Sequence, residues 1–171
     1  MKREGDSVYG RYDVVGWGNP VRRDGYAPDA RWYGNEPVLV HEVRGARAEA
    51  LIPRIEAAVA AYPWVGRGSY RVWPGPNSNT FVAFVLRQVP ELGAEMLPTG
   101  IGKDYLGPGL QFGRTPSGTG YQVSLAGVIG AALGRAEGLE FHVLGATIGI
   151  DADDLAVELP ALGTIGLGAA H

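Results

Sequence analysis

The chain has 171 residues, of which 46% are hydrophobic and 19% charged, and its formal net charge is −3. This composition is typical of a folded protein with a sizeable core, and the weak acidic balance excludes an electrostatic surface for nucleic acid. The absence of cysteine excludes disulfides, thiolate metal sites and a cysteine nucleophile.

The first third of the chain predicts short strands and loops. Residues 8–17 are rich in β-forming side chains and predict a strand, which the turn residues 18–20 end. The polar residues 21–29 predict a loop. A second loop, 31–37, carries Trp32 and Tyr33, and residues 38–43 predict a short strand that contains His41.

Two helices are predicted next. Leu51, Ile55, Val59 and Tyr62 recur at intervals of four, four and three residues, which favours a helix over about 46–62 with one apolar face. Pro53 lies inside that span and predicts either a kink or a helix that begins there. A short strand is expected over 70–73, and a second helix over 80–88 ends before Pro90.

The chain is organised around residues 73–81, which read Trp-Pro-Gly-Pro-Asn-Ser-Asn-Thr-Phe. The prolines fix an extended approach that places Asn77, Ser78 and Asn79 where the second helix begins. Asn and Ser are common N-caps, so the motif can serve the helix alone. A helix N-terminus also favours negative charge. The alternative is therefore a catalytic site, with Ser78 as nucleophile, Asn77 or Asn79 as oxyanion donors and His41 as general base.

The segment 93–120 is expected to be irregular, and a loop of this length is either functional or strapped across the core. Within it, Lys103 and Asp104 either bind a ligand or form a salt bridge in the loop. Trp73, with Trp32 and Tyr33, either lines a ligand cleft or covers the edge of the core.

The last third contains three similar segments about 18 residues apart: 125–130, 144–149 and 162–166. We interpret these segments as three antiparallel strands of a meander; a helix over 123–133 is the alternative, which its glycines disfavour. His142 alternates with Phe141 and Val143, which predicts an outward-facing surface histidine.

The predicted fold class is α+β: a small antiparallel sheet with two helices, followed by a glycine-rich β-meander. We expect a single domain over 1–171, made of an α+β half (1–92), the irregular loop (93–120) and the meander (121–171). No metal or cofactor site is expected. The three histidines are not clustered, residues 151–154 lack the calcium-loop pattern, and residues 97–104 depart from a phosphate loop.

No segment reaches the roughly 18 apolar residues that span a bilayer. The first six residues contain no apolar stretch and so do not form a signal peptide.

Five stretches resemble the bacterial domain of unknown function 3750 (DUF3750), and the likeness covers nearly the whole chain. They are residues 49–58, 73–81, 87–92, 98–105 and 113–120. The family has no established activity. The resemblance implies an envelope or membrane-associated protein, because family members usually carry a hydrophobic segment and a histidine-bearing strand upstream. It also implies that this chain is an N-terminally truncated form or a late-start gene model, and that membrane association would come only from the upstream segment.

Residues 77–81 also look like the Asn-Cys-x-x-Phe signature of circularly permuted papain-like (NlpC-type) hydrolases. That likeness places Ser78 at the nucleophile position, whereas His41 does not match the upstream histidine that would be the base. For this chain we favour a non-catalytic binding or structural module in the envelope. The alternative is an amide or ester hydrolase that uses Ser78. Substrate, partner and oligomeric state are not predicted by the sequence.

Overall fold

The computed structural model describes residues 1, 9–151, 156–159 and 163–166. Within these ranges the first elements are β1 (Tyr12–Val14), β2 (Val21–Arg23), α1 (Gly45–Ala60), α2 (Ser78–Gln88) and the short 3-10 helix η1 (Pro90–Leu92). Seven strands follow: β3 (Leu110–Arg114), β4 (Gly120–Leu125), β5 (Ile129–Gly134), β6 (Gly138–Val143), β7 (Ala146–Asp151), β8 (Ala156–Leu159) and β9 (Gly163–Gly166). The α+β class is confirmed.

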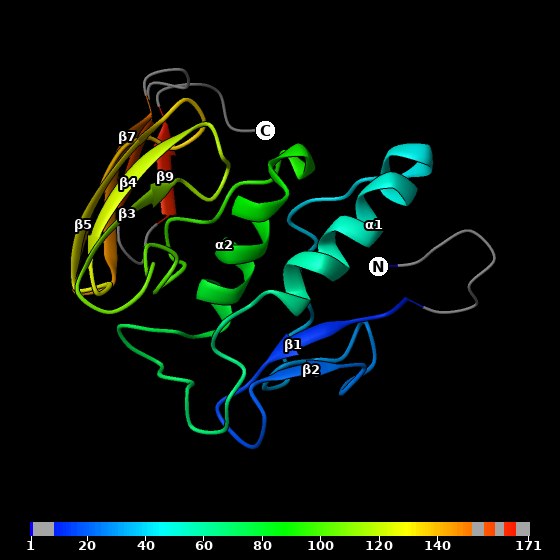
Figure 1. Cartoon of the computed structure of the whole chain (residues 1–171). Helices are drawn as coiled ribbons and strands as arrows, with labels where there is room; N and C mark the ends of the chain where they lie inside the picture. The colour runs from blue at the N-terminus through cyan, green and yellow to red at the C-terminus, as the bar shows by residue number, and fades with distance from the viewer. Residues whose placement is uncertain (2–8, 152–155, 160–162, 167–171) are drawn as a thin grey trace.

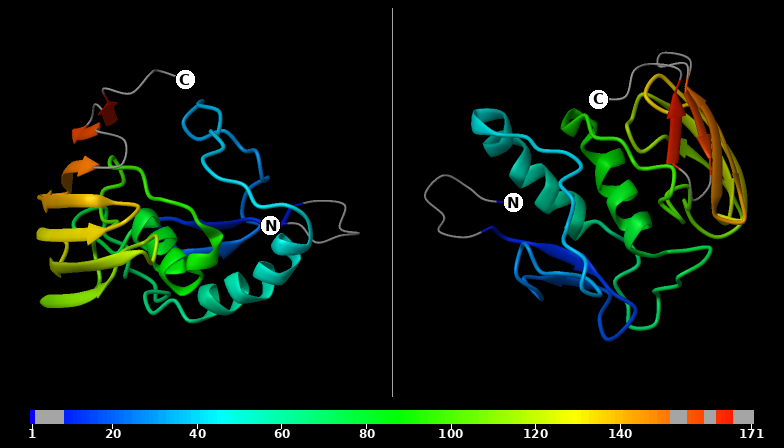
Figure 2. Two further views of the ribbon diagram at one scale, coloured as in Figure 1. Left: turned by 90° about the horizontal axis from the view of Figure 1, so that it is seen from above. Right: turned by 180° about the vertical axis from the view of Figure 1, so that it is seen from behind.

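The large sheet, α2 and α1 form three layers, with α2 in the middle. Strands β1 and β2 pair as a small hairpin, and β3 to β9 form one antiparallel sheet in which every strand pairs with its sequence neighbours. Helix α2 lies between this sheet and α1, and the hairpin lies at the ends of the helices (Figures 1 and 2). Residues 93–109 connect α2 to the sheet.

The apolar core lies in the helical half of the molecule. Its buried members come from α1, α2 and the residues that follow them: Leu51, Ala58, Val59, Tyr62, Phe81, Val85 and Val89. The ring of Tyr62 meets that of Phe81 edge to face, with centroids 5.0 Å apart. Burial of such side chains contributes about 1.5–3 kcal/mol each, so this interface is the main hydrophobic contribution to folding.

Helix α1 confirms the apolar periodicity to within two residues at each end, and it begins at Gly45 rather than at Pro53. Three local predictions were wrong. Residues 21–23 form β2 instead of a loop, whereas residues 38–43 and 70–73 form no strand. Val38 is 83% exposed and Val72 is 74% exposed. A strand needs a partner for its N–H and C=O groups, and β-forming side chains alone do not supply one.

The meander was predicted correctly, and the predicted strands 144–149 and 162–166 overlap β7 and β9, but the described sheet has seven strands rather than three. The sheet begins at β3, inside the segment expected to be irregular. The repeated segments 125–130 and 144–149 each begin with a turn, β4 to β5 and β6 to β7, in which Ala126, Gly127, Leu144 and Gly145 have positive φ, and continue into the next strand. One 18-residue period therefore spans a whole hairpin of two strands rather than one strand. The helix alternative over 123–133 is excluded, because this segment belongs to β4 and β5.

We expect Gly120→Ala to destabilise the sheet. Gly120 pairs with Gly134, and an added Cβ would lie 2.0 Å from the Leu133 carbonyl oxygen. The neighbouring backbone would have to move, at a cost of about 1–3 kcal/mol of unfolding free energy. Gly66→Ala is the matched control, since a Cβ there meets open space. Urea denaturation of both variants measures the difference, and equal midpoints would contradict the prediction.

Candidate functional site

The motif at residues 73–81 forms the N-terminal cap of α2. Asn77 is the N-cap: its side-chain oxygen accepts from the Thr80 backbone N–H at 3.0 Å, and the Thr80 hydroxyl accepts from the Asn77 N–H at 3.1 Å. This reciprocal pair is a capping box, which satisfies two of the N–H groups that a helix start leaves unpaired. Both side chains are buried.

Asn77 also joins three segments of the chain. Its amide nitrogen donates to the carbonyl oxygens of Val72 and Ile101, each at 2.9 Å. The Thr80 hydroxyl donates to the Gly102 carbonyl at 2.8 Å. A Cβ on Gly102 would lie 2.6 Å from the Asn77 amide nitrogen, so the loop packs directly against the cap. With both amide hydrogens engaged, Asn77 has no free donor for an oxyanion.

The other predicted catalytic residues are not brought together. Ser78 is exposed at the first position of α2, and the part of the chain that the structure describes offers its hydroxyl no hydrogen-bond partner. Asn79 donates to the Ile101 carbonyl at 3.0 Å. The His41 ring nitrogen Nε2 lies 2.8 Å from the carbonyl oxygen of Leu92, beyond the other end of α2. Ser78 and His41 are therefore near opposite ends of α2, whose 11 residues span about 16 Å.

Residues 100–105, called the bridging loop from here on, connect this cap to the sheet. Lys103 Nζ lies 2.6 Å from Glu140 Oε1, and both side chains are 3% exposed. The second oxygen of Glu140 lies 3.3 Å from His142 Nε2, and His142 Nδ1 lies 3.1 Å from the Thr147 hydroxyl. An ion pair thus joins the bridging loop to β6, and the contacts of His142 extend this polar network to Thr147 on β7.

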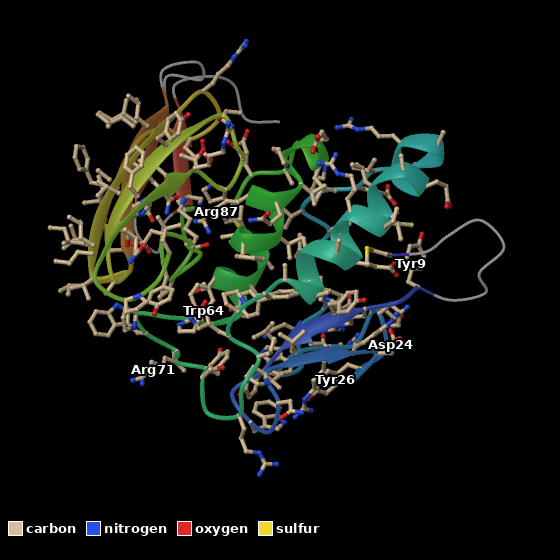
Figure 3. The ribbon with its side chains drawn as sticks, in the orientation of Figure 1. Tyr9, Asp24, Tyr26, Trp64, Arg71 and Arg87 are labelled. Carbon is tan, nitrogen blue, oxygen red and sulfur yellow. The ribbon has the colours of Figure 1, made fainter. Side chains whose placement is uncertain are left out.

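Asp104 binds the neighbouring strand. Its carboxylate accepts from the Ser124 hydroxyl at 3.1 Å, and its carbonyl accepts from the Gln122 side chain at 3.0 Å. Arg87 of α2 reaches the polar layer between the bridging loop and the sheet, where it donates to the carbonyls of Lys103 and Arg114. Figure 3 shows Arg87 between α2 and the sheet. Lys103 and Asp104 therefore meet different strands of the sheet rather than each other.

Burial sets the protonation states in this layer. It lowers the pKa of His142 to about 3, helped by the positive charges of Lys103 and Arg87. Burial also raises the pKa of Asp104 and lowers the pKa of Arg87 to about 10. His142 is therefore neutral at pH 7. Because a carboxylate only accepts, the ring carries its proton on Nε2 toward Glu140 and accepts from Thr147 at Nδ1.

The prediction of a surface position for His142 was wrong, because the side chain is 3% exposed. The sequence signal for burial of His142 was the alternation of polar and apolar residues. On β4 and β6 the polar side chains Gln122, Ser124, Glu140 and His142 occupy every second position, and the apolar ones lie between them. Sequence reasoning assumed that the apolar positions face inward. The sheet has the opposite orientation, since its inner face meets the polar bridging loop.

The predicted aromatic ligand site is divided between two places. Trp73 lies against the β6 to β7 turn, where a Cβ on Gly145 would be 3.1 Å from its ring. Trp32 stacks on Trp17 with ring centroids 6.3 Å apart, and Tyr33 meets it edge to face. All three predicted aromatic residues are more than 40% exposed.

A cleft of about 630 Å³ lies between the N-terminal segments and the helices. Its lining is mostly apolar, with Tyr12, Leu39, Ile55, Phe81 and Val85 among its residues. The cleft does not include Ser78, Trp73 or Lys103, so it is separate from the predicted site.

Among the residues that the structure describes, no group of three or more acidic or histidine side chains could hold a metal ion. No helix in the same residues is long and apolar enough to cross a membrane.

The fold and site define an α+β protein in which a capped helix and a bridging loop support an antiparallel sheet. A family model described as protein of unknown function (DUF3750) matches residues 1–105, from the N-terminus through the bridging loop. The chain belongs to this family. Neither a curated protein nor a solved structure matches it.

We expect Asn77→Ala to destabilise the protein far more than Ser78→Ala. Loss of an N-cap costs about 0.5–2 kcal/mol, and this variant also removes the side-chain donor of the Val72 carbonyl and one of the two donors of the Ile101 carbonyl. Ser78→Ala should change the unfolding free energy by less than about 0.5 kcal/mol, as exposed substitutions do. Urea denaturation compares the two, and a larger loss in Ser78→Ala would show that the cap has been assigned to the wrong residue.

His142 predicts a pH dependence of stability. Its pKa is about 3 in the folded protein against an ordinary value of 6.5, so between these values only the unfolded chain binds the proton. This contribution to stability is complete above pH 6.5 and is lost as the pH falls, by up to about 1.4 kcal/mol per pH unit. His142→Asn should remove that slope in urea denaturation between about pH 7 and about pH 5. Parallel curves for the two proteins would contradict the assignment.

Proposed function

We propose that the chain is a non-catalytic binding module of the cell envelope, and that it binds through the outer face of the sheet. The envelope location is supported by the resemblance described above. The binding surface is supported by the side chains that β3 to β7 direct away from α2, where sticks extend from the far side of the sheet in Figure 3.

The outer face carries the argument. The strand register aligns its side chains in three rows across five strands. The rows are Leu110–Leu125–Ile129–Val143–Ala146, Phe112–Val123–Ala131–Phe141–Ile148 and Arg114–Tyr121–Leu133–Leu139–Ile150. Of these fifteen positions, only Arg114 is charged.

The size of this face distinguishes it from an ordinary surface. Twelve of its large apolar residues are between 36% and 73% exposed. Together they present on the order of 1,000 Å² to solvent, whereas the largest apolar patch of a typical monomer is about 300–600 Å². A patch of that size usually marks an interaction site.

The motif at residues 73–81 supports the non-catalytic role. Asn77 and Thr80 direct their polar groups at the helix start and at the bridging loop, and His41 bonds to Leu92. Each side chain proposed for catalysis other than Ser78 therefore has a structural partner. These contacts give Asn77 and Thr80 a structural role in the motif that needs no catalytic reaction.

The alternative function is a serine-dependent amide or ester hydrolase. One observation favours it: Ser78 is exposed at a helix N-terminus, whereas Asn77 before it and Thr80 two residues after it are buried. Such a position can stabilise a developing negative charge.

A serine-reactive fluorophosphonate probe tests the two functions. The wild-type chain should not be labelled, because no described side chain accepts the Ser78 proton and serine needs such a base to react. Ser78→Ala is the control for labelling elsewhere. Labelling that disappears in Ser78→Ala would establish the hydrolase and overturn the non-catalytic proposal.

A further inference from the structure

We infer that the outer face of the sheet binds a second copy of this chain, so that two sheets pack face to face. The inference rests on the proposed binding role and names its partner. The alternative occupants of an apolar face are a lipid surface and an unrelated protein. Charge, area and the arrangement of side chains favour the second copy.

Charge argues against a lipid surface. Segments that lie on anionic membranes combine an apolar face with lysine and arginine around it. The chain has two lysines, Lys2 and Lys103, and thirteen arginines, of which Arg135 lies in the β5 to β6 turn at the edge of the face, and its net charge is −3. Lys103 is paired with Glu140 under the opposite face. The one cation on the face, Arg114, lies over the Tyr121 ring at a corner.

Area fits a homodimer. If each copy covers on the order of 1,000 Å², the total of about 2,000 Å² falls in the range of stable protein interfaces. Homodimer interfaces are also more apolar than transient ones. A face whose only charge is at one corner can be buried without leaving an unpaired charge at its centre, which would be costly.

The middle row provides self-complementarity. Ala131 pairs with Phe141 on the adjacent strand, so a small side chain lies beside a large one near the middle of the described face. In a two-fold dimer the same surface serves both copies. With the axis between β5 and β6, Phe141 of each copy would cover Ala131 of the other, and sheets that pack this way lie about 10 Å apart.

Light scattering on the purified chain between about 1 and about 100 µM tests the inference, since this range brackets a micromolar dissociation constant. The mass of the wild type should rise across this range toward twice the 18.1 kDa mass of the chain. Ile148→Lys, which would bury an unpaired charge, should raise the dissociation constant by about 100-fold or more. Val40→Lys is the matched control, because Val40 is 59% exposed on the helical half, and it should remain a dimer.

A cross-link keeps the inference testable if Ile148→Lys fails to fold. The chain contains no cysteine, so Phe141→Cys introduces a single thiol at the middle of the face. Facing sheets about 10 Å apart are beyond the reach of a disulfide, so the reagent is a bis-maleimide that spans about 10 Å. It should join two copies of this variant covalently, and Val40→Cys should not be joined. A dimer by mass that gives no cross-link through Phe141→Cys would overturn the face-to-face arrangement.

Two further outcomes separate this inference from the proposed function. A monomeric wild type that floats with phosphatidylcholine vesicles, and loses flotation in Ile148→Lys, would replace the second copy by a lipid surface and leave the binding role intact. A wild type that is monomeric throughout and does not float would overturn the inference. Fluorophosphonate labelling of Ser78 would overturn the proposed function without changing the mass of the dimer.

Discussion

The buried ion pair between Lys103 and Glu140 is the constraint on which the arrangement of the two halves depends. Two charges that leave water need each other and further hydrogen bonds, or the cost of burial is several kcal/mol per ion. His142 supplies one such bond to Glu140, while Arg87 holds the Lys103 carbonyl. The pair fixes the bridging loop on the sheet, and Asn77 fixes the same loop on α2. The bridging loop therefore holds the sheet in place, together with the direct contacts of Arg87 and Trp73.

The two halves are stabilised by different forces. Between α1 and α2, apolar side chains such as Leu51, Phe81 and Val85 give a large, non-directional contribution. Beneath the sheet, hydrogen bonds contribute about 0.5–1.5 kcal/mol each and require accurate geometry. Loss of one partner there leaves the other buried and unpaired, so single changes in this layer are costly although each bond is weak. This layer defines position more than it adds stability.

The predictions from sequence succeeded where the signal was local. The period of Leu51, Ile55 and Val59 defined α1, and the polar cluster 77–79 indicated a cap without showing that Asn77 rather than Ser78 provides it. The strands of the sheet were harder to predict, because its repeat spans a hairpin and some turn residues, such as Val128 and Leu144, are as apolar as those of the strands. His142 was assigned to the wrong face since alternation shows that two faces differ but not which one is buried. That choice depends on Lys103 and Asp104, which lie about 20 to 40 residues earlier in the chain.

The orientation of the sheet connects the site to the proposed surface. Since the polar positions of β4 and β6 are required by the bridging loop, the alternating apolar positions must point the other way. Exposing them costs free energy in water, so the arrangement is favourable only where something covers the outer face. A second copy of the same face satisfies this condition without adding a charge, and it also buries Ile148 and Phe141 at the middle of the new interface. The buried ion pair and the exposed apolar rows are thus two consequences of one strand register.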